Sequence, residues 1–146
     1  TVKREEFVKM LVQMAGIEVL PCDNQFTDVA AGAWYENYVN TAYNNGIVKG
    51  IGNGEFGVGR NIYREDMCVM AYNTLIKMGT ELPAGTDSFS DESDISEYAK
   101  APVKALNRAG VVNGVGENLF NPKGNATRAE AAVIIYNTLK ATGGLE

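Results

Sequence analysis

"IYREDMCVMAYNTL", at residues 62–75, recurs as "ATRAEAAVIIYNTL" at residues 126–139, with the arginine near the start and the tetrapeptide YNTL at the end both kept. Apolar residues are dense enough in both copies to predict a helix near the centre of the fold. A shift of 60 residues also aligns "VKREEFVKML" at residues 2–11 with the first copy. The chain therefore contains three copies of one predicted helix.

The similarity extends upstream of two of these copies. At a shift of 64 residues Gly46 falls on Gly110 and Trp34 on Tyr98, and at a shift of 63 the "FTD" that begins at Phe26 falls on "FSD". Each complete unit thus has a first half and a second half, whereas the first copy consists of a second half alone. We expect one domain over residues 1–146, with the end of repeat 1 at residues 1–20, repeat 2 at 24–80 and repeat 3 at 87–142.

Each complete unit is predicted to form two helices joined by a glycine-rich loop. The first helices span residues 33–46 and 101–110 and end at glycine, with Pro102 expected in the first turn of the second of them. The second helices start at Arg4, Arg64 and Arg128. A helix pair cannot bury its own apolar face, so the units must pack on one another. We predict an all-α fold with a pseudo-three-fold bundle; a straight solenoid is the alternative.

The repeated arginines, Arg4, Arg64 and Arg128, are not explained by helix physics. "TRAE" at residues 127–130 has the pattern of a capping box, which places the arginine in the first helical turn, where the helix dipole disfavours a cation. One interpretation is that the arginines pair with carboxylates and hold the units together. The other is that they form anion pockets with free helical N–H groups. The candidate carboxylates are Glu6, Asp66 and Glu130.

Two further pairs of equivalent residues are candidates for a site. Trp34 and Tyr98 are either core side chains or a platform on which a sugar ring stacks, and the core is the commoner fate of such aromatics. Gly50 and Gly114 either allow unusual backbone angles or let a ligand approach the backbone closely.

Composition excludes several classes of function. The chain has no histidine, which disfavours an enzyme and most transition-metal sites, and its net charge of −5 disfavours a nucleic-acid partner. The acidic run at residues 90–94 lacks the ligand spacing of a calcium loop, so we expect no metal and no cofactor. No apolar run approaches the length of a membrane span and no leader is visible, so membrane insertion is not expected. Cys22 and Cys68 are one disulfide or two separate thiols.

The motifs "FTDV", "GIVKG" and "IYRED", with their second copies "FSD", "GVVNG" and "ATRAE", resemble the S-layer homology repeat of bacterial surface proteins. The resemblance covers residues 2–142. It implies three repeats in a helical spindle that attaches an exported protein to the cell envelope, through an anionic secondary cell wall polysaccharide that carries a pyruvate ketal. The sequence departs from the family pattern at Lys3 and Tyr63, each of which replaces a threonine. It also lacks the first half of repeat 1.

From the residues and the resemblance together we predict a non-catalytic module at the bacterial cell surface that binds a wall glycan. The rival hypothesis is a protein-interaction module that binds another copy of itself or another surface protein. The residues predicted to contact the glycan are Arg4, Arg64, Arg128, Glu6, Asp66, Glu130, Trp34, Tyr98, Gly50 and Gly114.

Overall fold

The computed structural model describes residues 1–144, in which helices joined by long loops make up the regular structure, as predicted; the last two residues of the predicted domain lie outside the described part. Its α-helices are α1 (Arg4–Met14), α2 (Glu36–Asn44), α3 (Arg64–Lys77), α4 (Glu97–Arg108) and α5 (Arg128–Ala141), with one 3₁₀ turn, η1 (Glu92–Asp94). Over residues 1–144 the only β pairing consists of isolated bridges in the loops, so the all-α prediction is confirmed.

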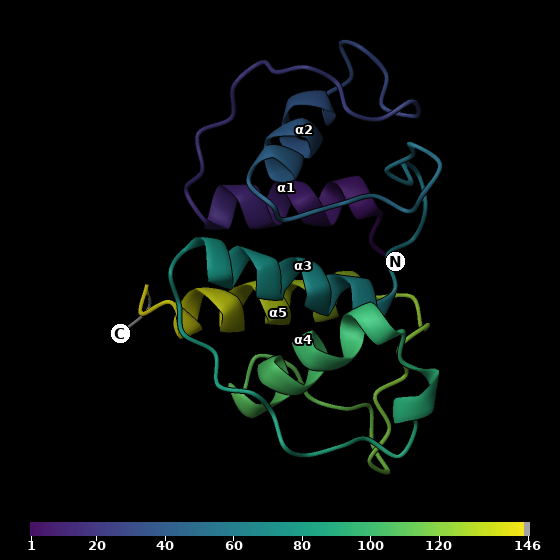
Figure 1. Ribbon diagram of the computed structural model, residues 1–146, viewed down its shortest axis with the longest axis vertical. Helices are drawn as coiled ribbons and strands as arrows, with labels where there is room; N and C mark the ends of the chain where they lie inside the picture. The colour runs from purple at the N-terminus through teal and green to yellow at the C-terminus, as the bar shows by residue number, and fades with distance from the viewer. Residues whose placement is uncertain (145–146) are drawn as a thin grey trace.

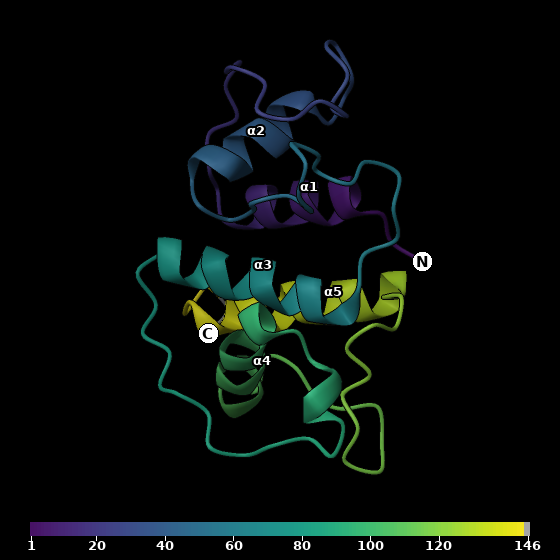
Figure 2. The ribbon, with the colours of Figure 1, turned by 45° about the vertical axis from the view of Figure 1, so that its right-hand side comes forward.

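The three repeated helices form the centre of the molecule. Figures 1 and 2 show α1, α3 and α5 side by side and running in the same direction. A closed ring of backbone hydrogen bonds joins the residues that precede them: Val2 N donates to Ala126 O at 3.0 Å, Ala126 N to Ile62 O at 3.0 Å, and Ile62 N to Val2 O at 2.9 Å. All three residues are buried. The ring confirms the pseudo-three-fold bundle and excludes the straight solenoid.

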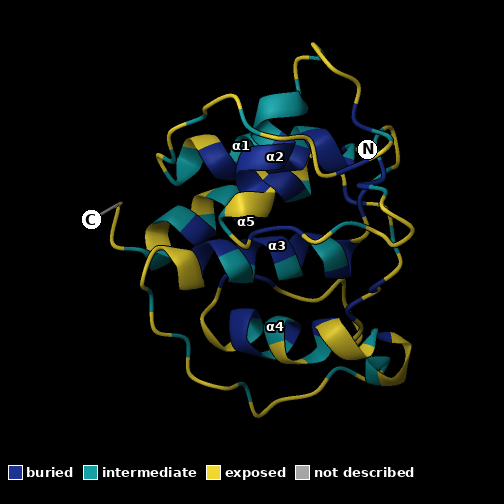
Figure 3. Cartoon of the chain, turned by 45° about the horizontal axis from the view of Figure 1, so that its top comes forward, coloured by how far each residue is buried: buried dark blue, intermediate teal, exposed yellow. Residues whose placement is uncertain are grey.

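The first-half helices pack on the outside of this centre, α2 against α1 and α4 against α3. They bury one face of each partner helix, including Val8 and Val12 of α1 and Cys68 of α3. Within residues 1–144 no helix plays this part for α5. Its equivalent face carries Ala129, Ala132, Val133 and Tyr136, all exposed, and Figure 3 colours parts of α5 as exposed.

The three central helices start in different ways. The capping box predicted for α5 is present: the Thr127 hydroxyl accepts a hydrogen bond from Glu130 N at 3.1 Å, and Thr127 N donates to the Glu130 carboxylate. In α1 Lys3 keeps only the second of these bonds, from its N–H to Glu6 Oε1 at 2.8 Å. In α3 no side chain caps the helix, and the N–H groups of Arg64 and Glu65 donate to carbonyl groups of the loop between α4 and α5.

Two predicted helix starts were wrong. Helix α4 begins at Glu97, so Pro102 is its sixth residue and lies beyond the first turn. The backbone hydrogen bond that Pro102 cannot make would have gone to the carbonyl group of Tyr98. Helix α2 begins at Glu36, which leaves Trp34 in the turn before it.

Cys22 and Cys68 are separate thiols in this structure. Cys68 is completely buried in the core, and this burial raises the pKa of its thiol to about 12. A thiol with so high a pKa stays protonated and behaves as a small apolar side chain.

Candidate functional site

The three repeated arginines form a cyclic set of ion pairs at the end of the bundle where the central helices begin. Arg4 Nη1 contacts Asp66 Oδ2 at 2.9 Å, Arg64 pairs with Glu130, and Arg128 Nη2 contacts Glu6 Oε2 at 2.8 Å. Each arginine therefore reaches the carboxylate two residues past the arginine of the next helix. All three arginines therefore pair with a carboxylate of another unit, as the first interpretation predicts.

The three pairs differ greatly in burial. The side chains of Arg4 and Arg64 are 6% and 9% exposed, whereas that of Arg128 is 71% exposed. Arg4 Nε donates to Phe56 O at 3.0 Å and its guanidinium lies 5.1 Å from the centre of the Phe56 ring; Arg64 makes the same contacts with Phe120. The glycine-rich loop of the next unit thus covers each buried arginine, and no such loop covers Arg128 among the described residues.

Two aspartates that our sequence reasoning did not select hold these covering loops in place. The Asp28 carboxylate accepts hydrogen bonds from the N–H groups of Phe56, Gly57 and Val58 at 2.7–2.9 Å, and Asp91 accepts from Phe120 and its neighbour. Partial burial of the Asp28 carboxyl raises its pKa, but the three backbone donors outweigh burial and leave the pKa below its ordinary value. The signal was available, because both residues are the aspartate of the repeated "FTD" and "FSD".

We expect Asp28→Asn to lower the free energy of unfolding by about 2 kcal/mol at pH 7, since the amide has one acceptor oxygen in place of two and no charge. Because the pKa of Asp28 is lower in the folded state, its stabilisation is complete above the unfolded value of about 4 and is lost as the pH falls through the folded value. Urea titrations at pH 7 and pH 3 should therefore show a gap between wild type and variant that shrinks in acid. Asp23→Asn, on an exposed carboxylate nearby, is the control; equal losses in both variants would contradict the assignment.

The two candidate glycines are needed where the covering loops fold back on themselves. A Cβ on Gly50 would lie 2.6 Å from Glu55 O and 2.7 Å from the Phe26 ring, and its φ of +94° favours glycine. A Cβ on Gly114 would lie 2.5 Å from Leu119 O, without a positive φ. The unusual backbone angle was therefore predicted correctly for Gly50, whereas close packing alone explains Gly114.

A groove of about 780 Å³ lies between the loop that covers Arg4 and the pair α3 and α4. Four of the predicted residues line it together: Arg4, Gly50, Asp66 and Tyr98. Tyr98 donates a hydrogen bond from its hydroxyl to Asp66 Oδ1 at 2.5 Å, so one carboxylate joins the arginine to the aromatic ring. Burial and this bond to Asp66 raise the pKa of the Tyr98 hydroxyl, which keeps it a donor.

The interpretation of Trp34 and Tyr98 as core side chains was wrong. Trp34 and Tyr98 are 53% and 59% exposed, so neither belongs to the buried core. Tyr98 lines the groove beside Val69 of α3. Trp34 lies over the equivalent residue of α1, Lys9, with Nζ 5.5 Å from the ring centre.

The remaining predicted residues form two less complete versions of this arrangement. Arg64 and Glu130 have the covering loop, with Gly114 beside the carbonyl that accepts from Arg64 Nη2, but no aromatic residue from a helix on α5. Arg128 pairs with Glu6 of α1, the helix whose Lys9 contacts the Trp34 ring, but no loop among the described residues covers this arginine. Only the Arg4 groove has both walls within residues 1–144.

These features define a class of protein: a closed helical tandem-repeat module with an arginine-containing groove between repeats. Sequence comparison gives the family, because the profile of the S-layer homology domain matches residues 25–68 and 88–132. The chain belongs to the S-layer homology domain family. Such domains anchor surface proteins and bind components of the cell wall.

The similar proteins are surface-layer proteins and polysaccharide-degrading enzymes. The chain is 38% identical over 147 residues to an amylopullulanase of Thermoanaerobacterium thermosulfurigenes, and 38% identical over 148 residues to exoglucanase XynX of Acetivibrio thermocellus. These alignments include 99% of this chain but 8% and 13% of the relatives. S-layer protein EA1 of Bacillus anthracis is 30% identical over 126 residues, which are 85% of this chain and 14% of that protein. The chain thus spans a small fraction of the length of each relative.

Among residues 1–144, no helix combines the length and the apolar character that crossing a bilayer requires.

Proposed function

We propose that this chain is a non-catalytic module that attaches a bacterial surface protein to the cell wall by binding an anionic secondary cell wall polysaccharide. The binding site is the Arg4 groove, and the anionic group is a carboxylate such as that of a pyruvate ketal. Arg4 supplies the cation, Asp66 orients it and accepts hydrogen bonds from sugar hydroxyls, and Tyr98 offers a ring face on which a sugar can stack.

The observation that carries this proposal is a difference between two buried arginines. All three guanidinium nitrogens of Arg64 are hydrogen bonded, to Phe120 O, Glu130 and Asn113 O. Arg4 uses Nε and Nη1 in the same way, but within residues 1–144 its Nη2 donates no hydrogen bond, and the side chain lines the groove. Arg4 therefore keeps a charged donor for a ligand.

The surroundings of the groove also favour an anion. Lys49, Arg60 and Lys123 line it in addition to Arg4, against the carboxylates of Glu65 and Asp66. The excess of cations is local, since the whole chain has a net charge of −5. We assign no reaction to the module, because the chain contains no histidine and each carboxylate of the groove is already paired with a cation.

The first test is co-sedimentation with purified wall sacculi of Thermoanaerobacterium thermosulfurigenes, before and after hydrofluoric acid removes the attached polysaccharide. Binding that disappears with the polysaccharide supports the proposal. Binding to both preparations would indicate peptidoglycan as the ligand, and absence of binding to intact sacculi would contradict the proposal.

Tyr98→Ala should weaken binding to intact sacculi about tenfold, because truncation of an aromatic residue central to a binding surface typically costs more than about 1 kcal/mol. The matched control is Tyr136→Ala, which removes an equally exposed tyrosine from α5, outside the groove (57% against 59% exposed). Dissociation constants from co-sedimentation at increasing protein concentration measure the effect. Equal binding by the two variants would remove Tyr98 from the site.

The exposed apolar face of α5 favours a second candidate function, a protein-interaction or self-assembly module. The equivalent faces of α1 and α3 are covered by α2 and α4, whereas Ala129, Ala132, Val133 and Tyr136 are open to solvent. Light scattering separates the two candidates: a stable dimer that Val133→Glu converts to a monomer supports self-assembly, whereas a wild-type monomer counts against it.

A further inference from the structure

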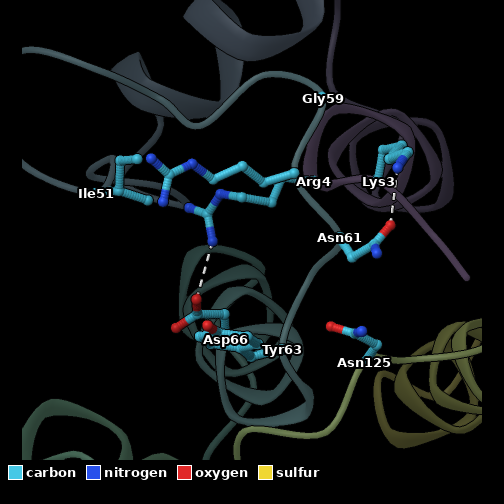
Figure 4. A pocket seen from close by; sticks show the side chains of 9 residues that line it. Lys3, Arg4, Ile51, Gly59, Asn61, Tyr63, Asp66 and Asn125 are labelled. Carbon is cyan, nitrogen blue, oxygen red and sulfur yellow. Dashed lines mark hydrogen bonds and ion pairs between the residues drawn. The ribbon is translucent and has the colours of Figure 1, made fainter.

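A second cavity, of about 490 Å³, continues the Arg4 groove toward the end of the bundle where α1 and α3 begin. We call it the axial pocket. It shares Arg4, Arg60 and Asp66 with the groove and adds Lys3, Asn61 and Asn125. Figure 4 shows Lys3, Asn61 and Asn125 on one side of this pocket and the Arg4–Asp66 pair on the other.

Two of the three cations that line the axial pocket form no ion pair with a described residue. Its charged residues are Lys3, Arg4, Arg60 and a single carboxylate, Asp66, which is already paired with Arg4. Lys3 Nζ donates to the neutral Asn61 Oδ1 at 2.9 Å, and Arg60 is exposed; neither side chain forms an ion pair within residues 1–144. The pocket also lies where the central helices present the positive ends of their dipoles. Of the charged side chains that line the pocket, only that of Asp66 would repel an anion; the carboxylates of Glu5 and Glu6 lie behind the lining, where they accept from Gly59 N and Lys3 N.

The pseudo-symmetry of the chain shows that the fold does not require these cations. The residues equivalent to Lys3 in the other two copies are Tyr63 and Thr127, and the residue equivalent to Arg60 is Gly124. Lysine also starts a helix poorly, because its charge opposes the helix dipole, whereas Thr127 makes a side-chain cap. Within residues 1–144, Lys3 and Arg60 line a common pocket only beside the Arg4 groove, and Lys3 does so at a cost to the start of α1.

We infer that the axial pocket is a second anion subsite, which binds an oxyanion, phosphate or carboxylate, on the sugar unit next to the one held in the Arg4 groove. This inference rests on the proposed function. Lys3 and Arg60 bind the oxyanion by charge-assisted hydrogen bonds, and the side-chain amide of Asn125 donates a further one. Because the groove and the pocket share Arg4, one polymer chain passes through both, and the preferred ligand carries negative groups on neighbouring units.

The experiment compares two double variants that change the net charge by the same amount. One is Lys3→Gln with Arg60→Gln. The control is Lys77→Gln with Lys140→Gln, two exposed lysines in the last turns of α3 and α5, at the other end of the bundle. The probe is wall polysaccharide released from the same sacculi with muramidase, which leaves its phosphates and carboxylates intact, and affinity is measured by titration calorimetry.

We expect Lys3→Gln with Arg60→Gln to bind about tenfold more weakly than wild type, and the control to lose less than about twofold. Thermal unfolding should show both variants folded, since neither Lys3 nor Arg60 belongs to the buried core. Because Arg60 also lines the groove, Lys3→Gln alone is compared with Lys77→Gln; equal affinity of these two single variants overturns the subsite while leaving the Arg4 groove intact. A wild-type chain that fails to bind overturns the proposed function as well, so the two failures are distinguishable.

A third preparation separates the two sources of the oxyanion. Hydrofluoric acid removes phosphodiesters from the released polysaccharide and leaves carboxylates. If the advantage of wild type over Lys3→Gln with Arg60→Gln disappears on this material, the subsite binds phosphate. If the advantage persists, the subsite binds a carboxylate.

Discussion

Arg4→Ala should lower the free energy of unfolding by about 3–5 kcal/mol, which is the usual effect of removing one partner of a buried ion pair. The substitution leaves Asp66, 15% exposed, without its cation, and Phe56 O without the donor that joins the covering loop to α1. It also empties the space over the Phe56 ring. Urea denaturation followed by circular dichroism measures the loss.

The control for this prediction is internal, because Arg128 has the same place in the repeat and the same kind of partner. Its side chain is 71% exposed, so Arg128→Ala should cost less than about 1 kcal/mol, as expected for a surface ion pair. If Arg4→Ala and Arg128→Ala are equally stable, burial of the arginine does not determine how much its ion pair contributes to stability.

Gly50→Ala should destabilise the domain by about 3 kcal/mol or more. The added methyl group meets a backbone oxygen at 2.6 Å and a buried ring at 2.7 Å, and neither can withdraw as a flexible side chain would. The positive φ adds strain of roughly 1 kcal/mol or more. Because the loop forms one wall of the groove, binding to sacculi should fall together with stability.

Gly52→Ala separates strain from collision. Gly52 has a similar φ, +104° against +94°, but nothing lies within 4 Å of the position that an added Cβ would take. We therefore expect a cost of about 1–2 kcal/mol, from strain alone. A loss as large as that of Gly50→Ala would show that backbone conformation, and not the close approach to Glu55, makes glycine necessary in this loop.

The sequence predicted the parts of the fold that recur. Three copies of one apolar pattern with an arginine at its start identify the central helices, and the capping box at residues 127–130 places the start of α5 correctly. Helix starts without such a signal were harder to place. Ser96 makes no side-chain cap for α4, and Pro102, which usually marks a first turn, displaced the predicted start by several residues.

The sequence could not predict which copy of the site is complete. Equivalent residues have the same spacing in each copy, but Arg4, Arg64 and Arg128 receive their surroundings from other units. Whether an arginine retains a free donor depends on contacts such as that between Arg64 Nη2 and Asn113 O, which span 49 residues. The exposure of Tyr98 also depends on contacts between units. Periodicity in the sequence indicates which side of a helix faces a neighbouring helix, but not how much of a side chain on that side stays exposed.

The ring of backbone bonds through Val2, Ile62 and Ala126 also determines how this protein unfolds. In an open repeat array each unit contacts only its neighbours, so units can melt one at a time. Here the bond between Val2 and Ala126 joins residues 124 positions apart and cannot form until every unit is in place. We therefore expect a single cooperative unfolding transition, in which a destabilising substitution in one repeat lowers the stability of all three.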